Sequence, residues 1–231
     1  MKTFAQKITA VGTGIFLAAS VASYGTILYS DNTVDTGNSL GFTNGETLGQ
    51  QLTINGFNAL TLTNFSFELY STNVAFSSAV MMDVTLLTNN GTLFNGYASP
   101  GTSFYDSGLF ALQSPLTTTA GASTVETLTF SGLSISMPTN FTLAFSISGL
   151  GVNTNIAVEL FGTATVGVNN GDYWLNNPNA GGYALYTNST PVEFGAQFQG
   201  TGTVVPEPSV IYLGVAGMAA LMGAVRLRRK K

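Results

Sequence analysis

The sequence contains neither cysteine nor histidine, and only 8% of its 231 residues are charged, against about 25% in an average soluble protein. Without cysteine there are no disulfides, and thiol nucleophiles and Cys-ligated metal sites are excluded. Without histidine, catalytic triads built on that residue and His-ligated zinc or iron sites are excluded as well. The acid–base chemistry that remains is that of paired carboxyl groups.

Positive charge is missing from the whole middle of the chain. The seven bases lie near the two ends, at Lys2, Lys7, Arg226, Arg228, Arg229, Lys230 and Lys231. Ten of the eleven acids lie in the body of the chain, residues 23–205, at Asp31, Asp35, Glu46, Glu68, Asp83, Asp106, Glu126, Glu159, Asp172 and Glu193. This body therefore has a formal charge of −10, which argues against nucleic-acid binding because phosphates are neutralised by Lys and Arg. Most of the acids have polar sequence neighbours, so we expect solvated side chains.

Residues 1–22 have the pattern of a secretory signal peptide. Lys2 and Lys7 make the start positive, residues 8–19 are largely apolar, and small residues follow, with cleavage sites after Ala22 or Ser23. A buried helix or a membrane anchor is the alternative, but the apolar run is about a dozen residues, short of the ~20 that a spanning helix needs. The pattern predicts export.

The C-terminal end combines three features. Pro206-Glu207-Pro208 precedes an apolar stretch, residues 210–225, and a basic cluster closes the chain at Arg226, Arg228, Arg229, Lys230 and Lys231. As a helix the apolar stretch would be roughly 24 Å long, at the short end for a bilayer core of ~30 Å, and the basic side chains can extend to the interface. The positive cluster favours the cytoplasmic side, which predicts that residues 23–205 lie outside. A buried core helix with a basic tail is the alternative.

This order of motif, apolar helix and basic cluster resembles the PEP-CTERM sorting signal of Gram-negative bacteria, over about 27 C-terminal residues. In that family the signal is read by exosortase, a membrane-embedded enzyme similar to cysteine transpeptidases. The resemblance implies that Pro206, Glu207 and Pro208 are recognition residues of a substrate. It also implies a precursor anchored in the inner membrane by residues 205–231 and a processed product at the cell surface or in the exopolysaccharide matrix.

Residues 23–204 alternate between apolar and polar side chains with the period of a β-strand. Examples are the runs Val80–Leu87 and Phe141–Ser148. Turn dipeptides separate such runs, and Leu86–Phe94 is expected to form a hairpin with Asn90-Gly91 at its tip. We expect an all-β fold, a single β-sandwich of jelly-roll type, with a closed barrel as the alternative. Such a body resembles the ectodomains commonly attached to this sorting signal, as does the segment 100–108.

Two acids near the mature N-terminus are a candidate calcium site. Asp31 and Asp35 lie in the polar segment 31–38, which also contains two asparagines and a glycine. Calcium prefers carboxylate and carbonyl oxygens, although the segment lacks the spacing of an EF-hand loop. A polar turn capped by its own Asp and Asn side chains is the alternative interpretation.

Asp172, Tyr173 and Trp174 are candidates for glycan binding. They lie in an Asn- and Gly-rich segment and include the only tryptophan of the chain. Aromatic faces stack on sugar rings while carboxylates and amides bind sugar hydroxyls. The alternative is that Trp174 closes one end of the sandwich as part of the core.

The sequence thus leads to three functional hypotheses. The first is a secreted or surface-anchored, non-enzymatic protein that exosortase sorts and that acts in the envelope or the exopolysaccharide matrix, with no resident cofactor. The second is a carbohydrate-binding module for an extracellular polysaccharide. The third is a glycan hydrolase that uses two carboxyl groups, for which no motif selects a pair among the ten acids.

Overall fold

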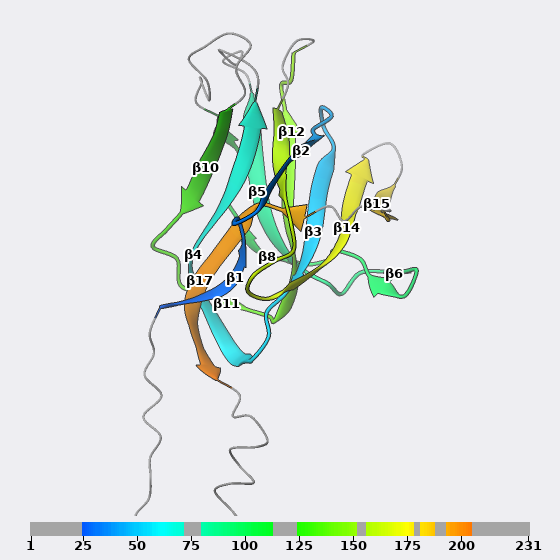
Figure 1. Ribbon diagram of the computed structural model, residues 1–231. Coiled ribbons are helices and arrows are strands. Elements are labelled where there is room, and N and C mark those ends of the chain that lie inside the picture. Colours follow the sequence, from blue (N-terminus) through cyan, green and yellow to red (C-terminus); the bar gives the residue numbers. More distant parts are fainter. Residues whose placement is uncertain are drawn as a thin grey trace, which may run out of the picture.

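The computed structural model describes residues 25–71, 80–112, 124–151, 156–177, 181–187 and 193–204. Within these ranges every regular element is a β-strand, and the strands form two packed sheets and a small hairpin (Figure 1). The all-β, sandwich-like prediction is therefore confirmed. In these ranges there is no helix long and apolar enough to cross a membrane. The signal peptide and the sorting signal lie outside the described residues.

The first sheet has eight strands, and all of their pairings are antiparallel. Its main path runs through β1 (Thr26–Asp31), β17 (Ala196–Val204), β4 (Phe57–Ser71), β13 (Ile156–Phe161) and β16 (Glu193–Phe194). Off this path lie β10 (Thr124–Phe130) and β11 (Ile135–Met137), which pair with β4, and β2 (Asp35–Gly41), which pairs with β13. The pairing of β1 with β17 joins the two ends of the body.

The second sheet has seven strands, again paired antiparallel. Its path runs through β15 (Gly182–Tyr186), β14 (Val168–Asn177), β3 (Thr47–Thr53), β12 (Asn140–Ser148), β5 (Met81–Thr88) and β8 (Ser103–Asp106), with β9 (Phe110–Ala111) beside β5. Hydrogen bonds also link the two sheets; for example, the Phe194 amide of β16 donates to the buried Gln50 Oε1 of β3 at 2.7 Å.

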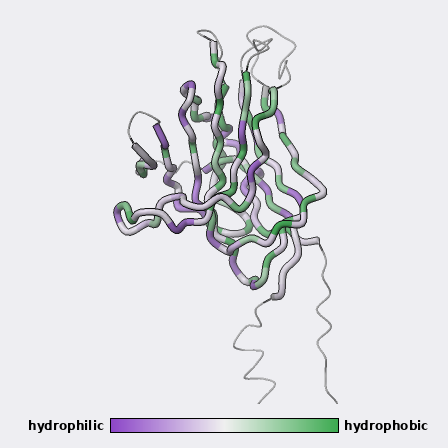
Figure 2. Tube along the Cα trace, turned by 180° about the vertical axis from the view of Figure 1, so that it is seen from behind, coloured by the Kyte–Doolittle hydropathy of each residue, from purple (hydrophilic) through white to green (hydrophobic). Residues whose placement is uncertain are grey.

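Phenylalanine rings fill the space between the sheets. Phe65 and Phe67 of β4, on the first sheet, are fully buried, as are Phe141 and Phe145 of β12 on the second. Phe67 and Phe145 meet across the sandwich with ring centroids 4.5 Å apart. The alternation that predicted these strands is what aims the rings inward, and Figure 2 shows hydrophobic and paler stretches alternating along the chain.

The hairpin prediction was wrong in its position. The hairpin pairs β6 (Leu93–Phe94) with β7 (Tyr97–Ala98), and its two-residue tip is Asn95-Gly96. Both tip residues have positive φ, 50° and 87°, as a type I′ turn requires. Asn90 instead fixes the base of the loop, because its Oδ1 accepts from the Thr102 amide at 3.1 Å. Figure 1 shows the hairpin projecting from the side of the sandwich.

Candidate functional site

Several acids of the body lie in close pairs. The carboxyl groups interact in three of them: Asp31 with Glu193, Asp35 with Glu159, and Asp83 with Asp106. Burial and the repulsion of a neighbouring acid raise the pKa of Asp31, Glu159 and Asp83. The described residues include no Lys, Arg or His that could neutralise these groups. The raised pKa values favour the neutral forms of these acids, which need no cation beside them.

Asp31 and Glu193 form the most deeply buried pair, with 1% and 6% of their surface exposed. Asn169 Nδ2 of β14 donates to Asp31 Oδ2 at 3.2 Å and to the Tyr29 hydroxyl oxygen at 3.0 Å. The Ala164 amide donates to Glu193 Oε2 at 3.1 Å. Burial, followed by the adjacent Glu193, raises the pKa of Asp31 to about 8. This cluster ties β1 and β16 of the first sheet to β14 of the second.

Glu159 of β13 is the buried member of the second pair and is 3% exposed. Burial raises its pKa to about 7, assisted by the hydrogen bond to Asp35 and by the charges of Asp35 and Glu68. Its Oε2 atom is buried and has no hydrogen-bond partner. A neutral acid tolerates such an atom far better than a carboxylate does. Asp35 also accepts the Gly37 amide at 2.7 Å.

Asp83 and Asp106 form the third pair, on β5 and β8. Ser107 Oγ donates to Asp83 Oδ1 at 3.2 Å and accepts the Val84 amide at 2.9 Å. Burial and the nearby Asp106 raise the pKa of Asp83 above its ordinary value. Ser107 thus orients the carboxyl group of Asp83.

The expectation of solvated acids was wrong for Asp31, Glu159 and Glu193, which are buried. A signal was present in the sequence. Glu159 interrupts an otherwise apolar strand of six residues, and Glu193 directly precedes the buried Phe194. An acid among apolar neighbours is a candidate for a protonated, buried side chain.

The Asp31–Glu193 pair does not have the arrangement used in glycoside hydrolysis. Glycosidases hold their two carboxyl groups roughly 5–10 Å apart, with the sugar or a water between them. Asp31 and Glu193 instead lie beside each other and are buried from solvent. The Asp31–Glu193 pair therefore contributes to the packing of the fold and leaves no room for a substrate between its two groups.

Asp31 and Asp35, the calcium candidates, face different partners. Asp31 lies beside Glu193 and accepts a hydrogen bond from Asn169, whereas Asp35 lies beside Glu159 and accepts one from the Gly37 amide. Across the described ranges, no three His, Cys, Asp or Glu side chains are grouped so that they could hold a metal ion. The contact between Asp35 and the Gly37 amide is the capped polar turn that was the alternative interpretation.

The glycan candidates are placed differently from one another. Trp174 is fully buried, so its ring offers no face to a sugar, but it lies outside the core cluster and does not close an end of the sandwich as the alternative supposed. It lies opposite Gly49, which in turn lies opposite Ala144, so the indole covers the outer face of the second sheet beside small residues. Tyr173 stacks on Tyr186 at 5.3 Å, and Asp172 is half-buried.

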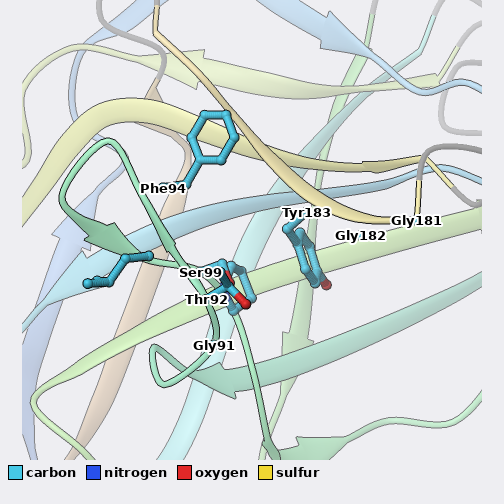
Figure 3. A pocket seen from close by; sticks show the side chains of 9 residues that line it. Gly91, Thr92, Phe94, Ser99, Gly181, Gly182 and Tyr183 are labelled. Carbon is cyan, nitrogen blue, oxygen red and sulfur yellow. The ribbon is translucent and has the colours of Figure 1, made fainter.

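A pocket of about 430 Å³ lies between the β6–β7 hairpin and β15 (Figure 3). Its walls come from two segments that are far apart in the sequence, and the lining residues are Gly91, Thr92, Leu93, Phe94, Ser99, Pro100, Gly181, Gly182 and Tyr183. Sequence reasoning missed this pocket, since only the fold brings the two segments together.

The sorting residues Pro206, Glu207 and Pro208 and the basic cluster lie outside the described residues. No protein-family model matches the chain, and no curated protein or solved structure matches it either. The two ends of the sequence and the described sandwich are therefore the features from which a function can be inferred.

Proposed function

We propose that this chain is an exported surface protein that exosortase processes and whose β-sandwich acts in the cell envelope or the exopolysaccharide matrix without catalysis. The observation that carries the proposal is the order of features at the C-terminus. Pro206-Glu207-Pro208, the apolar residues 210–225 and the five terminal bases occur together and in sequence.

The chemistry of that end fits a processing site. Two prolines one residue apart disfavour both helix and strand, so Glu207 is held in an extended segment that an enzyme can reach. The apolar stretch keeps the precursor in the inner membrane, and the bases hold its end on the cytoplasmic side. Residues 23–204 are then presented on the far side of the membrane.

The sandwich is suited to an extracellular setting. It is held together without disulfides, since the chain has no cysteine, and its surface polarity comes largely from hydroxyl and amide groups. Gln51 Nε2 donates to Asn140 Oδ1 at 2.9 Å, and Asn140 Nδ2 donates to Thr53 Oγ1 at 2.9 Å. Neutral bonds of this kind are less sensitive to salt than ion pairs. We further propose a jelly-roll type of sandwich, which the pairing of β1 with β17 favours.

The test is the double substitution of Glu207 and Pro208 by Ala, expressed in a bacterium that has an exosortase. The full-length precursor should accumulate in the inner membrane because the recognition residues are gone. Ser209→Ala is the matched control, since it alters the neighbouring residue and leaves the motif intact. Processing of the double variant at the normal rate would overturn the proposal.

A further inference from the structure

We propose that the pocket between the β6–β7 hairpin and β15 binds an uncharged saccharide. This inference goes beyond the sorting proposal and does not depend on it. The pocket also differs from the Asp172–Trp174 segment that the sequence suggested, because its aromatic rings come from other residues.

Two aromatic residues line the pocket from opposite segments. Phe94 comes from the hairpin and Tyr183 from β15, and Figure 3 shows both rings beside the pocket. Phe94 is 41% exposed, which makes it the most exposed phenylalanine among the described residues. Leu93 beside it is 70% exposed. Apolar side chains gathered at the rim of a hollow are the usual platform for a ligand ring.

The other lining groups include Pro100, side-chain hydroxyls and backbone without side chains. Thr92 and Ser99 contribute side-chain hydroxyls, which both donate and accept hydrogen bonds as sugar hydroxyls do. Gly181 and Gly182 have φ values of 79° and 147°, a region that favours glycine, and they present main-chain groups with no side chain in the way. Aromatic faces combined with a few neutral polar groups suit a sugar ring, because the ring has an apolar face and carries hydroxyls around its edge.

The hairpin side of the pocket, which we call the hairpin wall, is held in place by its own backbone hydrogen bonds. The Gly91 amide donates to Ser99 O at 2.9 Å, and the Ser99 amide donates to Thr92 O at 3.0 Å. A side chain at Gly91 would collide with Ser99, because a Cβ there would lie 2.4 Å from Ser99 Oγ. The Asn95-Gly96 turn closes the far end. Such a wall loses little conformational entropy on binding.

Charge decides which class of saccharide fits. No charged side chain lines the pocket, and the described residues have no base with which to hold a uronate, sulfate or phosphate. The ten acids of the body repel such groups at a distance. The volume of about 430 Å³ is within the range of small-ligand sites. A neutral oligosaccharide is therefore favoured over an acidic one.

The experiment uses the full-length chain in lauryldimethylamine oxide, because a detergent with a sugar head group would compete for the pocket. The probes are cellotetraose, mannotetraose and chitotetraose, with tetragalacturonic acid as the acidic comparison. Saturation-transfer NMR and calorimetry measure binding. At least one neutral probe should bind with a Kd of roughly 1 mM or tighter, and the acidic probe should bind at least about tenfold more weakly.

Variants locate the site. Phe94→Ala and Tyr183→Ala should each weaken the binding of the neutral probe roughly tenfold, since each removes a ring contact. Phe94→Tyr keeps the ring and should bind that probe as the parent chain does. Tyr97→Ala is the matched control, because Tyr97 is on the same hairpin, 40% exposed, and does not line the pocket. Circular dichroism verifies that each variant is folded. Failure of all three neutral probes, equal binding of the acidic probe, or unchanged binding in both Ala variants would overturn the inference.

Discussion

Raising the pH from 5 to 8 should destabilise the sandwich, because two buried acids hold protons when the chain is folded. Burial and neighbouring acids raise the pKa of Asp31 to about 8 and that of Glu159 to about 7. Both values are raised on folding, so protonation stabilises the folded state. This stabilisation is complete below about pH 4, where the unfolded chain is protonated too. It is lost progressively as the pH rises from the unfolded-state to the folded-state pKa values, and it is gone above them.

The size of the change in unfolding free energy follows from the proton that Asp31 binds in the folded chain but not in the unfolded one. Between pH 5 and pH 7 folded Asp31 is protonated and unfolded Asp31 is ionised, so the free energy of unfolding falls by about 1.4 kcal/mol per pH unit. Over this interval Asp31 alone contributes a loss of about 3 kcal/mol, and Glu159 adds to it with the same sign. A domain with a total stability of about 5–15 kcal/mol would register that change clearly.

The assay is urea unfolding of residues 23–204 at several pH values, followed by the fluorescence of Trp174. Trp174 is the single tryptophan and is fully buried, so its emission reports global unfolding. Asp31→Asn cannot ionise and should flatten the pH dependence between pH 5 and pH 7. Asp172→Asn, outside the three carboxyl pairs, should keep the parent slope. Stability that rises from pH 5 to pH 8, or an equal slope in Asp31→Asn, would refute the reasoning.

Three further outcomes are expected. Gly200→Ala should destabilise the fold by about 1–3 kcal/mol or more in the same urea assay, because its Cβ would lie 2.2 Å from Thr61 O. Gly41→Ala is the control and should change stability little, because no atom lies within 4 Å of its Cβ position. Trp174→Ala should cost about 3–5 kcal/mol by leaving a cavity, as measured by calorimetry; a melting temperature equal to the parent's would contradict its burial. Millimolar calcium should not shift the melting temperature, since Asp31 and Asp35 have separate partners; a clear rise would restore a calcium site there.

The strands were predictable because their side chains repeat with period two. Met82, Val84 and Leu86 of β5 are fully buried, as their alternation predicted. Alternation does not say what covers the other face, and that is where sequence reasoning failed. Thr142, Ala144 and Trp174 are on the outer side of the second sheet and are nevertheless buried.

The carboxyl pairs and the pocket could not be predicted because each joins residues that are distant in the sequence. Asp31 is near the start of the body and Glu193 near its end, and they meet because β1 pairs with β17, which places Asp31 opposite Ala196, three residues after Glu193. The hairpin was misplaced for a local reason. Asn90-Gly91 and Asn95-Gly96 carry the same turn signal, and contacts with Ser99 and Thr102 decide between them.

The central claim is that this acidic sandwich is delivered to the outside of the cell by signals at its two ends. The most direct test is the intact mass of the mature protein, recovered from the surface or matrix fraction of a bacterium that has an exosortase. We expect a chain that begins after Ala22 or Ser23 and ends near Pro206–Pro208. An intact chain of 231 residues recovered from the cytosol, with both ends uncut, would contradict the account.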